Sequence, residues 1–134
     1  MANIAIRKTG TYYGDSRAFV LADISAQPGR INVTLDMTKF VAATHAPKGY
    51  LPSGLILGKV SATGFYGIHD SAASDGREIA AGFLWDAFAP DSWTGKEATA
   101  LWVGPGLITE SRLPAASGVG AKAKTDLAAW FKFY

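Results

Sequence analysis

Residues 51–84 read LPSGLILGKVSATGFYGIHDSAASDGREIAAGFL, and they contain two apolar runs bounded by turn residues. The first run covers 55–68 and the second covers 78–85, with a polar loop that ends in Asp75-Gly76 between them. Apolar and polar side chains alternate along the first run, as they do on the two faces of a strand. The pattern predicts a central β-hairpin with a wide loop.

Three glycines interrupt the first of these runs, at positions 58, 64 and 67. A glycine inside a strand marks a bend or a close approach of another backbone, because it has no Cβ. The second run is largely apolar on both faces, which is typical of strands that are covered on both sides. We therefore expect a bent first strand and a second strand that is buried on both faces.

The clearest alternation in the chain lies upstream, at 30–37. Its apolar face consists of Ile31, Val33, Leu35 and Met37. The sequence Gln-Pro-Gly-Arg at 27–30 fits a type II turn, which would connect this run to an apolar run at 18–24. We predict an N-terminal hairpin over 18–37, with an edge that is available to pair with a neighbouring chain.

The C-terminal part predicts one more strand and a helix. Residues 98–103 form an apolar run that ends at a Gly-Pro-Gly turn. From position 119 the apolar spacing becomes helical, and the residues on this face are Val119, Ala123, Leu127, Trp130 and Phe131. This spacing predicts a short helix over 119–131. The last five residues, WFKFY, are too aromatic for a loose tail, so we expect them to dock on the sheet or on a neighbouring subunit.

The composition fits one domain with apolar surface to spare. The chain has 134 residues, of which 49% are hydrophobic and only 18% are charged. A domain of this length buries roughly two thirds of its unfolded surface, and spare apolar surface usually forms an interface. The net charge of +2 is too small for a nucleic-acid-binding face, and no apolar run approaches the ~20 residues of a membrane span. The chain has no cysteine and no recognisable signal peptide, so we expect no disulfides and synthesis in the cytoplasm.

No set of catalytic or metal-binding residues stands out in the sequence. The two histidines, His45 and His69, are isolated and lack the spacing of a zinc site. The carboxylates near His69 belong to Asp70, Asp75 and Glu78. They would form either a calcium or acid–base cluster or a solvated hairpin tip, and alanines where a calcium loop needs oxygen ligands favour the tip. We therefore expect a protein that is not an enzyme and that needs no cofactor.

Residues 1–17 contain few large aliphatic side chains and carry Tyr12 and Tyr13 between two glycines. Two interpretations are open: a frayed terminus, or an arm that becomes ordered on a partner. Tyrosines suit the second, since they supply contact area at a small cost in entropy. We expect a flexible N-terminal arm at 1–17 and a single β-rich domain at 18–134.

The central stretch also carries an ordered series of turn and strand motifs. They are Gly54, LGKV at 57–60, TGFY at 63–66, Asp70, SDG at 74–76 and AAG at 80–82, followed by SRLP at 111–114 and a tail with Trp130 and Phe131. In this order the segment resembles the lambda-type head decoration proteins of tailed phages. The resemblance covers about the last two thirds of the chain.

The resemblance implies a mostly β, β-clip (β-tulip-like) domain with one short C-terminal helix and an extended N-terminal arm. It also implies a homotrimer on the surface of the virion. This trimer would bind the major capsid protein at three-fold and quasi-three-fold positions of the expanded phage head and stabilise the head against the pressure of its DNA. By analogy, the residues in contact with the coat protein would be Tyr12, Tyr13, Phe19 and Val20. The trimer contacts would be Trp93, Trp130, Phe133 and Tyr134.

Two other classes remain open from the residues alone. Trp93 lies in a turn-rich loop, 87–97, where it either fills the bottom of the core or is exposed as a contact residue. An exposed Trp93 with aromatic neighbours would suit a carbohydrate-binding or small-ligand-binding β domain on a virion or cell surface. A trimeric β-fold enzyme is the second alternative, and the lack of clustered acid, base and phosphate-binding residues is evidence against it.

Overall fold

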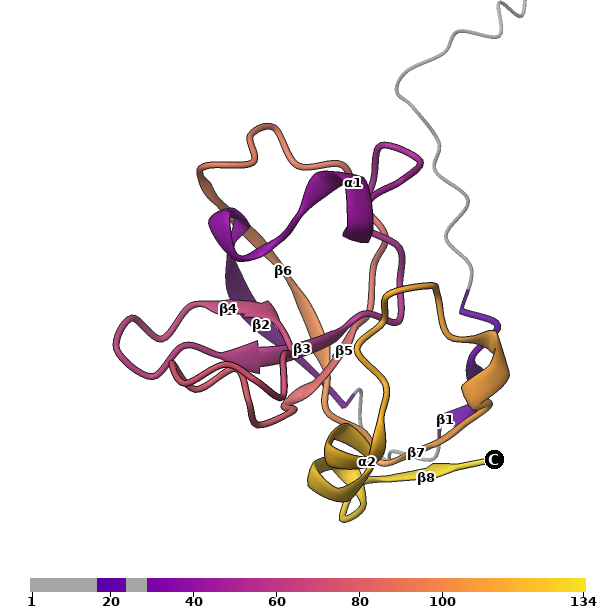
Figure 1. Cartoon of the computed structure of the whole chain (residues 1–134). Coiled ribbons are helices and arrows are strands. Elements are labelled where there is room, and N and C mark those ends of the chain that lie inside the picture. The colour runs from indigo at the N-terminus through magenta and orange to yellow at the C-terminus, as the bar shows by residue number, and fades with distance from the viewer. Residues whose placement is uncertain (1–16, 24–28) are drawn as a thin grey trace, which may run out of the picture.

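The computed structural model describes residues 17–23 and 29–134, so the predicted arm, apart from Arg17, lies outside the described residues. The strands form a closed five-stranded barrel, in the order β2-β4-β3-β5-β6, and a three-stranded sheet, in the order β1-β7-β8 (Figure 1). The barrel strands are β2 (Arg30–Asp36), β3 (Ile56–Lys59), β4 (Tyr66–Ile68), β5 (Gly82–Leu84) and β6 (Lys96–Trp102). The sheet strands are β1 (Val20–Asp23), β7 (Gly106–Ile108) and β8 (Phe131–Phe133).

The helices of the described part of the chain are short. They are the 3₁₀ turns η1 (Met37–Lys39) and η2 (Glu110–Arg112), the single turn α1 (Ala42–His45) and the C-terminal helix α2 (Ala121–Leu127). The predicted fold class, mostly β with one short helix near the C-terminus, is confirmed.

The barrel encloses the first of two apolar cores. Along β2 the side chains alternate, so that Val33 and Leu35 are buried while Asn32 is exposed. The buried members of this core are Val33, Leu35, Met37, Phe40, Ala46, Leu51, Leu55, Leu57, Ile68, Leu84 and Leu101. Burial of these apolar side chains is the main force that closes the barrel.

The second core joins the barrel to the three-stranded sheet and to α2 (Figure 1). Its buried members are Phe19, Ile56, Ala80, Phe83, Trp102, Ile108, Ala123, Leu127 and Phe131. Phe83 and Leu84 on β5 belong to different cores, as do Leu101 and Trp102 on β6. The prediction that the second apolar run is buried on both faces is therefore confirmed for β5.

The predicted hairpin over 18–37 is wrong. Strand β1 pairs antiparallel with β7, and β2 pairs antiparallel with β6, so the two runs lie in different sheets. Their alternation predicted strands but not partners, because partners are chosen by which core each apolar face enters. Phe19, next to β1, enters the second core, whereas Val33 and Leu35 enter the first. Part of the predicted turn, 24–28, lies outside the described residues.

The first central run, predicted as one strand, folds back into β3 and β4. Gly64, at φ 77°, stands in the turn between them, where a left-handed conformation favours glycine. Strand β3 pairs antiparallel with β4 and also with β5, so the predicted pairing of the two runs is confirmed while the single long strand is wrong. A Cβ on Gly58 would lie 2.7 Å from Cα of Arg77, which is the close backbone approach that the sequence predicts.

The C-terminal helix is shorter than predicted, because α2 ends at Leu127 rather than at 131. Residues 131–133 form β8, which runs parallel to β7. The strand buries Phe131 in the second core, and Phe133 packs against the same core. A helix through these positions would not place 131 and 133 on one face, whereas a strand does. The terminal aromatic segment thus docks on the sheet.

Candidate interaction surface

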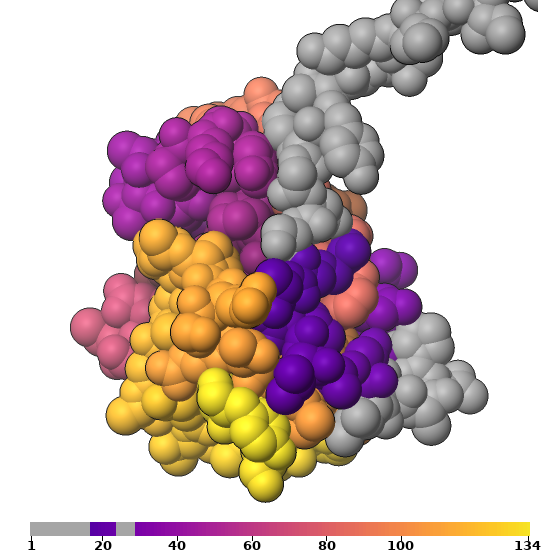
Figure 2. All heavy atoms as spheres, turned by 90° about the vertical axis from the view of Figure 1, so that its right-hand side faces the viewer, coloured from indigo at the N-terminus to yellow at the C-terminus, as the bar shows by residue number. Residues whose placement is uncertain are grey.

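The three-stranded sheet brings the first described strand and the C-terminal strand onto one face of the molecule. Figure 2 shows this face, with the residues around β1 (indigo) near the C-terminal residues (yellow). Strands β1 and β8 are the two edges of the sheet. Three large side chains in and beside these edges are exposed: Leu21 by 55%, and Trp130 and Tyr134 by 60% each. We refer to Leu21, Trp130 and Tyr134 as the edge cluster.

The β8 strand separates core residues from surface residues by alternation. Phe131 and Phe133 face the second core, while Lys132 between them is exposed. The Lys132 ammonium group lies 5.5 Å from the ring centre of Tyr134. This contact holds a cation over an aromatic ring at the end of the chain. The edge cluster therefore offers apolar area with a charged neighbour, which is typical of protein interfaces.

Arg17 fixes the point where the chain enters this face. Its Nε group donates to the carbonyl oxygen of Trp85 at 2.9 Å, and its Nη2 group lies 2.6 Å from the Asp86 carboxylate. The guanidinium groups of Arg17 and Arg30 each lie 4.6 Å from the ring centre of Trp85. Arg30 also pairs with Asp23 at 3.6 Å. Arg17, the first described residue, and Arg30, the first residue of β2, are therefore held at the same tryptophan ring.

The residues predicted to contact the coat protein differ in position. Tyr12 and Tyr13 lie outside the described residues. Phe19 is 1% exposed in the second core, so the structure gives its side chain a packing role and corrects its assignment as a surface contact. Burial of a large aromatic ring in the core explains this placement. Val20 is half-buried against the same core.

The predicted trimer residues separate into two groups. Trp130, Phe133 and Tyr134 lie together in or beside β8, and Phe133 is half-buried while the other two are exposed. Trp93 is half-buried and packs against the barrel core, away from the second core to which β8 belongs. Of the two interpretations for Trp93, the structure favours the core-filling one. Leu21 was missed from the sequence, although its position after Phe19 and Val20 in an apolar run could have suggested a strand face.

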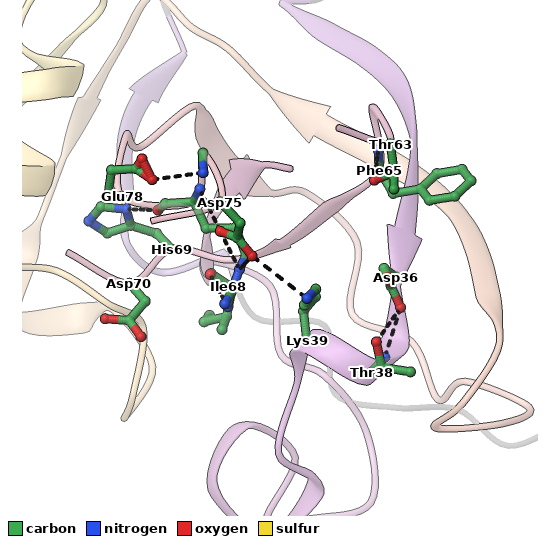
Figure 3. Close-up of polar contacts among 12 residues, drawn as sticks. Asp36, Thr38, Lys39, Thr63, Phe65, Ile68, His69, Asp70, Asp75 and Glu78 are labelled. Atoms are coloured by element: carbon green, nitrogen blue, oxygen red, sulfur yellow. Dashed lines mark hydrogen bonds and ion pairs between the residues drawn. The ribbon is translucent and has the colours of Figure 1, made fainter. Parts of the chain in front are cut away.

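The carboxylates of the 70–78 loop are held by their own loop and its neighbours (Figure 3). Asp75 lies 3.0 Å from Arg77 Nε and 3.6 Å from Lys39 Nζ. Partial desolvation opposes its charge, but hydrogen bonds from Arg77 and the charges of Arg77 and Lys39 lower the pKa of Asp75 below its ordinary value. The Arg77 carbonyl oxygen also bonds to His69 Nδ1 at 2.8 Å. These contacts hold the 70–78 loop together and tie it to Lys39 of η1.

The two remaining carboxylates of this loop cap backbone amides. Asp70 Oδ1 accepts from the amide of Ala72 at 2.9 Å, and Glu78 Oε1 accepts from the amide of Gly76 at 2.7 Å. Within residues 17–23 and 29–134, no three His, Cys, Asp or Glu side chains come together in a way that could hold a metal ion. The loop carboxylates thus bond to amides and side chains of their own loop and of Lys39, as in the hairpin-tip interpretation.

Asp126 fastens helix α2 to the segment that follows this loop. Its Oδ2 atom accepts a hydrogen bond from the backbone amide of Ala80 at 3.0 Å, and its Oδ1 atom lies 2.8 Å from Lys122 Nζ. Desolvation opposes the charge of Asp126, but the bonds from Lys122 and Ala80 lower its pKa below the ordinary value. This carboxylate therefore serves the fold, because it joins the helix to the start of the central second run.

In the part of the chain that the structure describes, no helix has both the length and the apolar character needed to cross a membrane. Comparison of the chain with protein-family models, with curated proteins and with solved structures gives no match.

Proposed function

We propose that this chain is a structural decoration protein of a tailed-phage head, which binds the expanded shell as a homotrimer and stabilises it. The observation that best supports the proposal is the position of the edge cluster. Three exposed side chains lie in or beside β1 and β8, those of Leu21, Trp130 and Tyr134. These two strands are the edges of the three-stranded sheet. Exposed aromatic residues beside open strand edges are suited to subunit contacts.

The shell would be stabilised because binding of this protein is linked to the equilibrium between shell states. A protein that binds only the expanded shell stabilises that state by its binding free energy. A trimer that touches several coat subunits gains from a high effective concentration once its first contact has formed, so each contact need only be weak. Tyr12 and Tyr13, which lie outside the described residues, would supply the coat contact.

The experiment that tests the proposal is sedimentation of a lysate from the natural source through a density gradient. The amount of this chain and of the major coat protein in each fraction is measured by mass spectrometry. The proposal requires that the chain travel with large DNA-filled particles in an amount comparable to the coat protein. A chain that stays at the top of the gradient as a small oligomer contradicts it.

A carbohydrate-binding or small-ligand-binding domain is the alternative that the structure keeps open. The indole ring of Trp130 is 60% exposed, and an exposed indole can stack on the apolar face of a sugar. Titration of the tryptophan fluorescence with a panel of glycans distinguishes the two proposals. A saturable change that is lost in Trp130→Ser would favour the ligand-binding domain, and no change with any glycan would favour the decoration protein.

A further inference from the structure

The barrel closes between β2 and β4 through a single residue pair. Strand β2 pairs with β6 along all seven of its residues, from Arg30 to Asp36, but it meets β4 only where Leu35 lies opposite Tyr66. The turn that connects β3 to β4 projects from the barrel (Figure 1). Among the described strands, only β6 therefore pairs with the first half of β2.

The β2–β6 ladder shows in which direction the backbone groups of β2 point. At one end the Val103 amide donates to the Gly29 carbonyl oxygen at 2.7 Å, and at the other end the Met37 amide donates to that of Gly95 at 3.1 Å. Hydrogen-bonded and non-hydrogen-bonded pairs alternate along an antiparallel ladder, so the odd-numbered residues of β2 bond to β6. Asn32 therefore directs its N–H and C=O groups away from β6, and its side chain is exposed.

A groove of about 360 Å³ runs beside this part of β2. Residues 31–34 of β2 form one of its walls, and Lys59 together with the turn at 63–66 forms the other. Figure 3 shows Thr63 and Phe65 of this turn beside β2. The groove therefore lies on the side of β2 that β6 does not occupy.

The inner face of β2 becomes more exposed toward the start of the strand. Leu35 is 0% exposed, Val33 is 7% exposed and Ile31 is 45% exposed, although alternation places all three on one face. A strand placed in the groove would cover the Ile31 side chain. It would also bond to the N–H and C=O groups of Asn32, which point away from β6.

The charge of the groove favours an acidic occupant. Among the described residues that line it, Lys59 is charged and none carries a carboxylate. Lys59 is exposed, and no ion pair between described residues includes it. The Lys96 ammonium group adds positive charge 5.3 Å from the ring centre of Phe65, and it is balanced by Asp36 at 3.8 Å at the far end of β2. A carboxylate in the groove would pair with Lys59, whereas a basic occupant would be repelled.

The lysine and the exposed isoleucine lie on the same face of the barrel sheet. Lys59 lies opposite Tyr66, and Tyr66 lies opposite Leu35, so these three side chains share a face. Ile31 is on this face too, because it is four residues from Leu35 in one strand. One added strand can therefore direct an apolar side chain toward Ile31 and a carboxylate toward Lys59 from alternate positions.

We propose that this groove binds an extended, acidic segment of a partner protein, which adds to β2 as a further strand. The backbone of the segment bonds to Asn32, an apolar side chain covers Ile31, and a carboxylate at an alternate position pairs with Lys59. In this mode of recognition the backbone bonds supply affinity and the alternate side chains supply specificity. The site is independent of the proposed decoration function, because it needs only the described barrel.

Two matched synthetic peptides test the preference for acidic segments. The probes are fluorescein-labelled TVTETVT and TVTKTVT, which differ only in the charge of the central residue. TVTETVT should bind the purified full chain at least about fivefold more tightly in fluorescence anisotropy, because it attracts Lys59 where the other probe repels it. Lys59→Glu should reverse this preference, and Lys48→Glu should not, since Lys48 is exposed but does not line the groove. Equal affinities, or no binding of either probe, would overturn the proposal.

Hydrogen exchange locates the bound probe on the full chain. The Asn32 amide should exchange at least about tenfold more slowly with saturating TVTETVT than without it. The Val33 amide, which bonds to β6, should exchange equally in both samples and shows that the barrel is intact. An Asn32 amide that the probe leaves unchanged would contradict strand addition. An amide that is already protected in the free chain would contradict it too, because this edge would then have another occupant.

Two variants separate strand addition from simple attraction of charge. Asn32→Pro removes the donor without removing a bond to β6, and proline is tolerated in a strand where its missing N–H faces away from the ladder. Ile31→Ser removes the apolar contact. Each should weaken the binding of TVTETVT by at least about fivefold and leave the circular dichroism spectrum unchanged. Wild-type affinity in both folded variants would rule the site out. Self-association of the wild type that Ile31→Ser abolishes would instead identify a second copy of the chain as the occupant and overturn the proposal.

Discussion

The guanidinium carbon of Arg17 lies 4.6 Å from the ring centre of Trp85, and the Arg17 Nε group donates to the Trp85 carbonyl oxygen at 2.9 Å. These contacts join the first described residue to Trp85, directly after β5 and 68 positions along the chain. Both side chains are also near Arg30, which starts the barrel. Arg17 therefore anchors the first described residue of the chain to Trp85.

Replacing Arg17 should lower the free energy of unfolding only modestly. Arg17→Ala is expected to lower the free energy of unfolding by about 1 kcal/mol, because partly exposed charge-assisted bonds contribute little more than this. Asp86→Ala, which removes only the exposed ion pair, should cost less than about 0.5 kcal/mol. Urea denaturation measures both. If Arg17→Ala matched the wild type, the contacts with Trp85 would not anchor the segment.

The hydrogen bond from the Ala80 amide to Asp126 should contribute more to the free energy of unfolding than the ion pair between Asp126 and Lys122. Asp126→Ala leaves the partly buried amide of Ala80 without its acceptor and is expected to cost about 1–3 kcal/mol. Lys122→Ala removes only an exposed i,i+4 pair with the same carboxylate and should cost about 0.5 kcal/mol or less. The measurement is again the midpoint and slope of denaturation. Similar losses for the two variants would show that the charge, rather than the amide bond, fastens α2.

The edge cluster makes a prediction about assembly rather than stability. If the chain forms the proposed homotrimer, Trp130→Ser with Tyr134→Ser should convert it to monomers in analytical ultracentrifugation, and each monomer should stay folded, because both side chains are exposed. Val41→Ser, which alters an exposed apolar residue elsewhere on the surface, should leave the oligomer intact. A double variant that remains an oligomer would exclude the edge cluster as the subunit contact.

The sequence predicted the local character of the strands well and their partners poorly. The alternation at 30–37, the turn glycine at 64 and the doubly buried second run all have structural counterparts. The pairing of β1 with β7 joins residues more than eighty positions apart, and no local pattern specifies such a contact. Periodicity reports only which face of an element is apolar, and two apolar faces can meet in many ways.

The exposed residues of the edge cluster could be predicted only in part, because periodicity reports a face of an element and not its partners. Trp130 and Tyr134 stand at alternate positions around Phe131 and Phe133, so a strand reading of the last five residues would have separated surface from core. The helical spacing of Leu127, Trp130 and Phe131 concealed this alternation. The closure of the barrel by a single pair between β2 and β4, Leu35 with Tyr66, could not be read from the sequence, because no local pattern specifies it.

His45 gives the chain a pH dependence near neutrality. Burial lowers the pKa of His45, and the Val41 amide donates to its Nδ1 atom at 2.9 Å, which requires that nitrogen to be unprotonated. A histidine pKa that is lower in the folded state contributes stability above the unfolded value of ~6.5, and this contribution is lost as the pH falls below it. The free energy of unfolding should thus decline from pH 7 to pH 5 by up to about 1 kcal/mol more in the wild type than in His45→Gln. Parallel profiles for the two proteins would contradict this role.

Gly82 tests the packing between the neighbouring barrel strands β5 and β6. A Cβ at this position would collide with the carbonyl oxygen of Trp102, whose residue is fully buried, and would lie 3.2 Å from the Leu101 side chain. Backbone atoms within a paired sheet cannot move aside without loss of ladder bonds, so Gly82→Ala is expected to cost about 3 kcal/mol or more. Gly95→Ala is the matched control, since the nearest atom to its new Cβ would be 3.8 Å away, and it should be nearly neutral. Thermal denaturation followed by tryptophan fluorescence compares the two, and equal midpoints would mean that β5 and β6 can separate locally without disturbing either core.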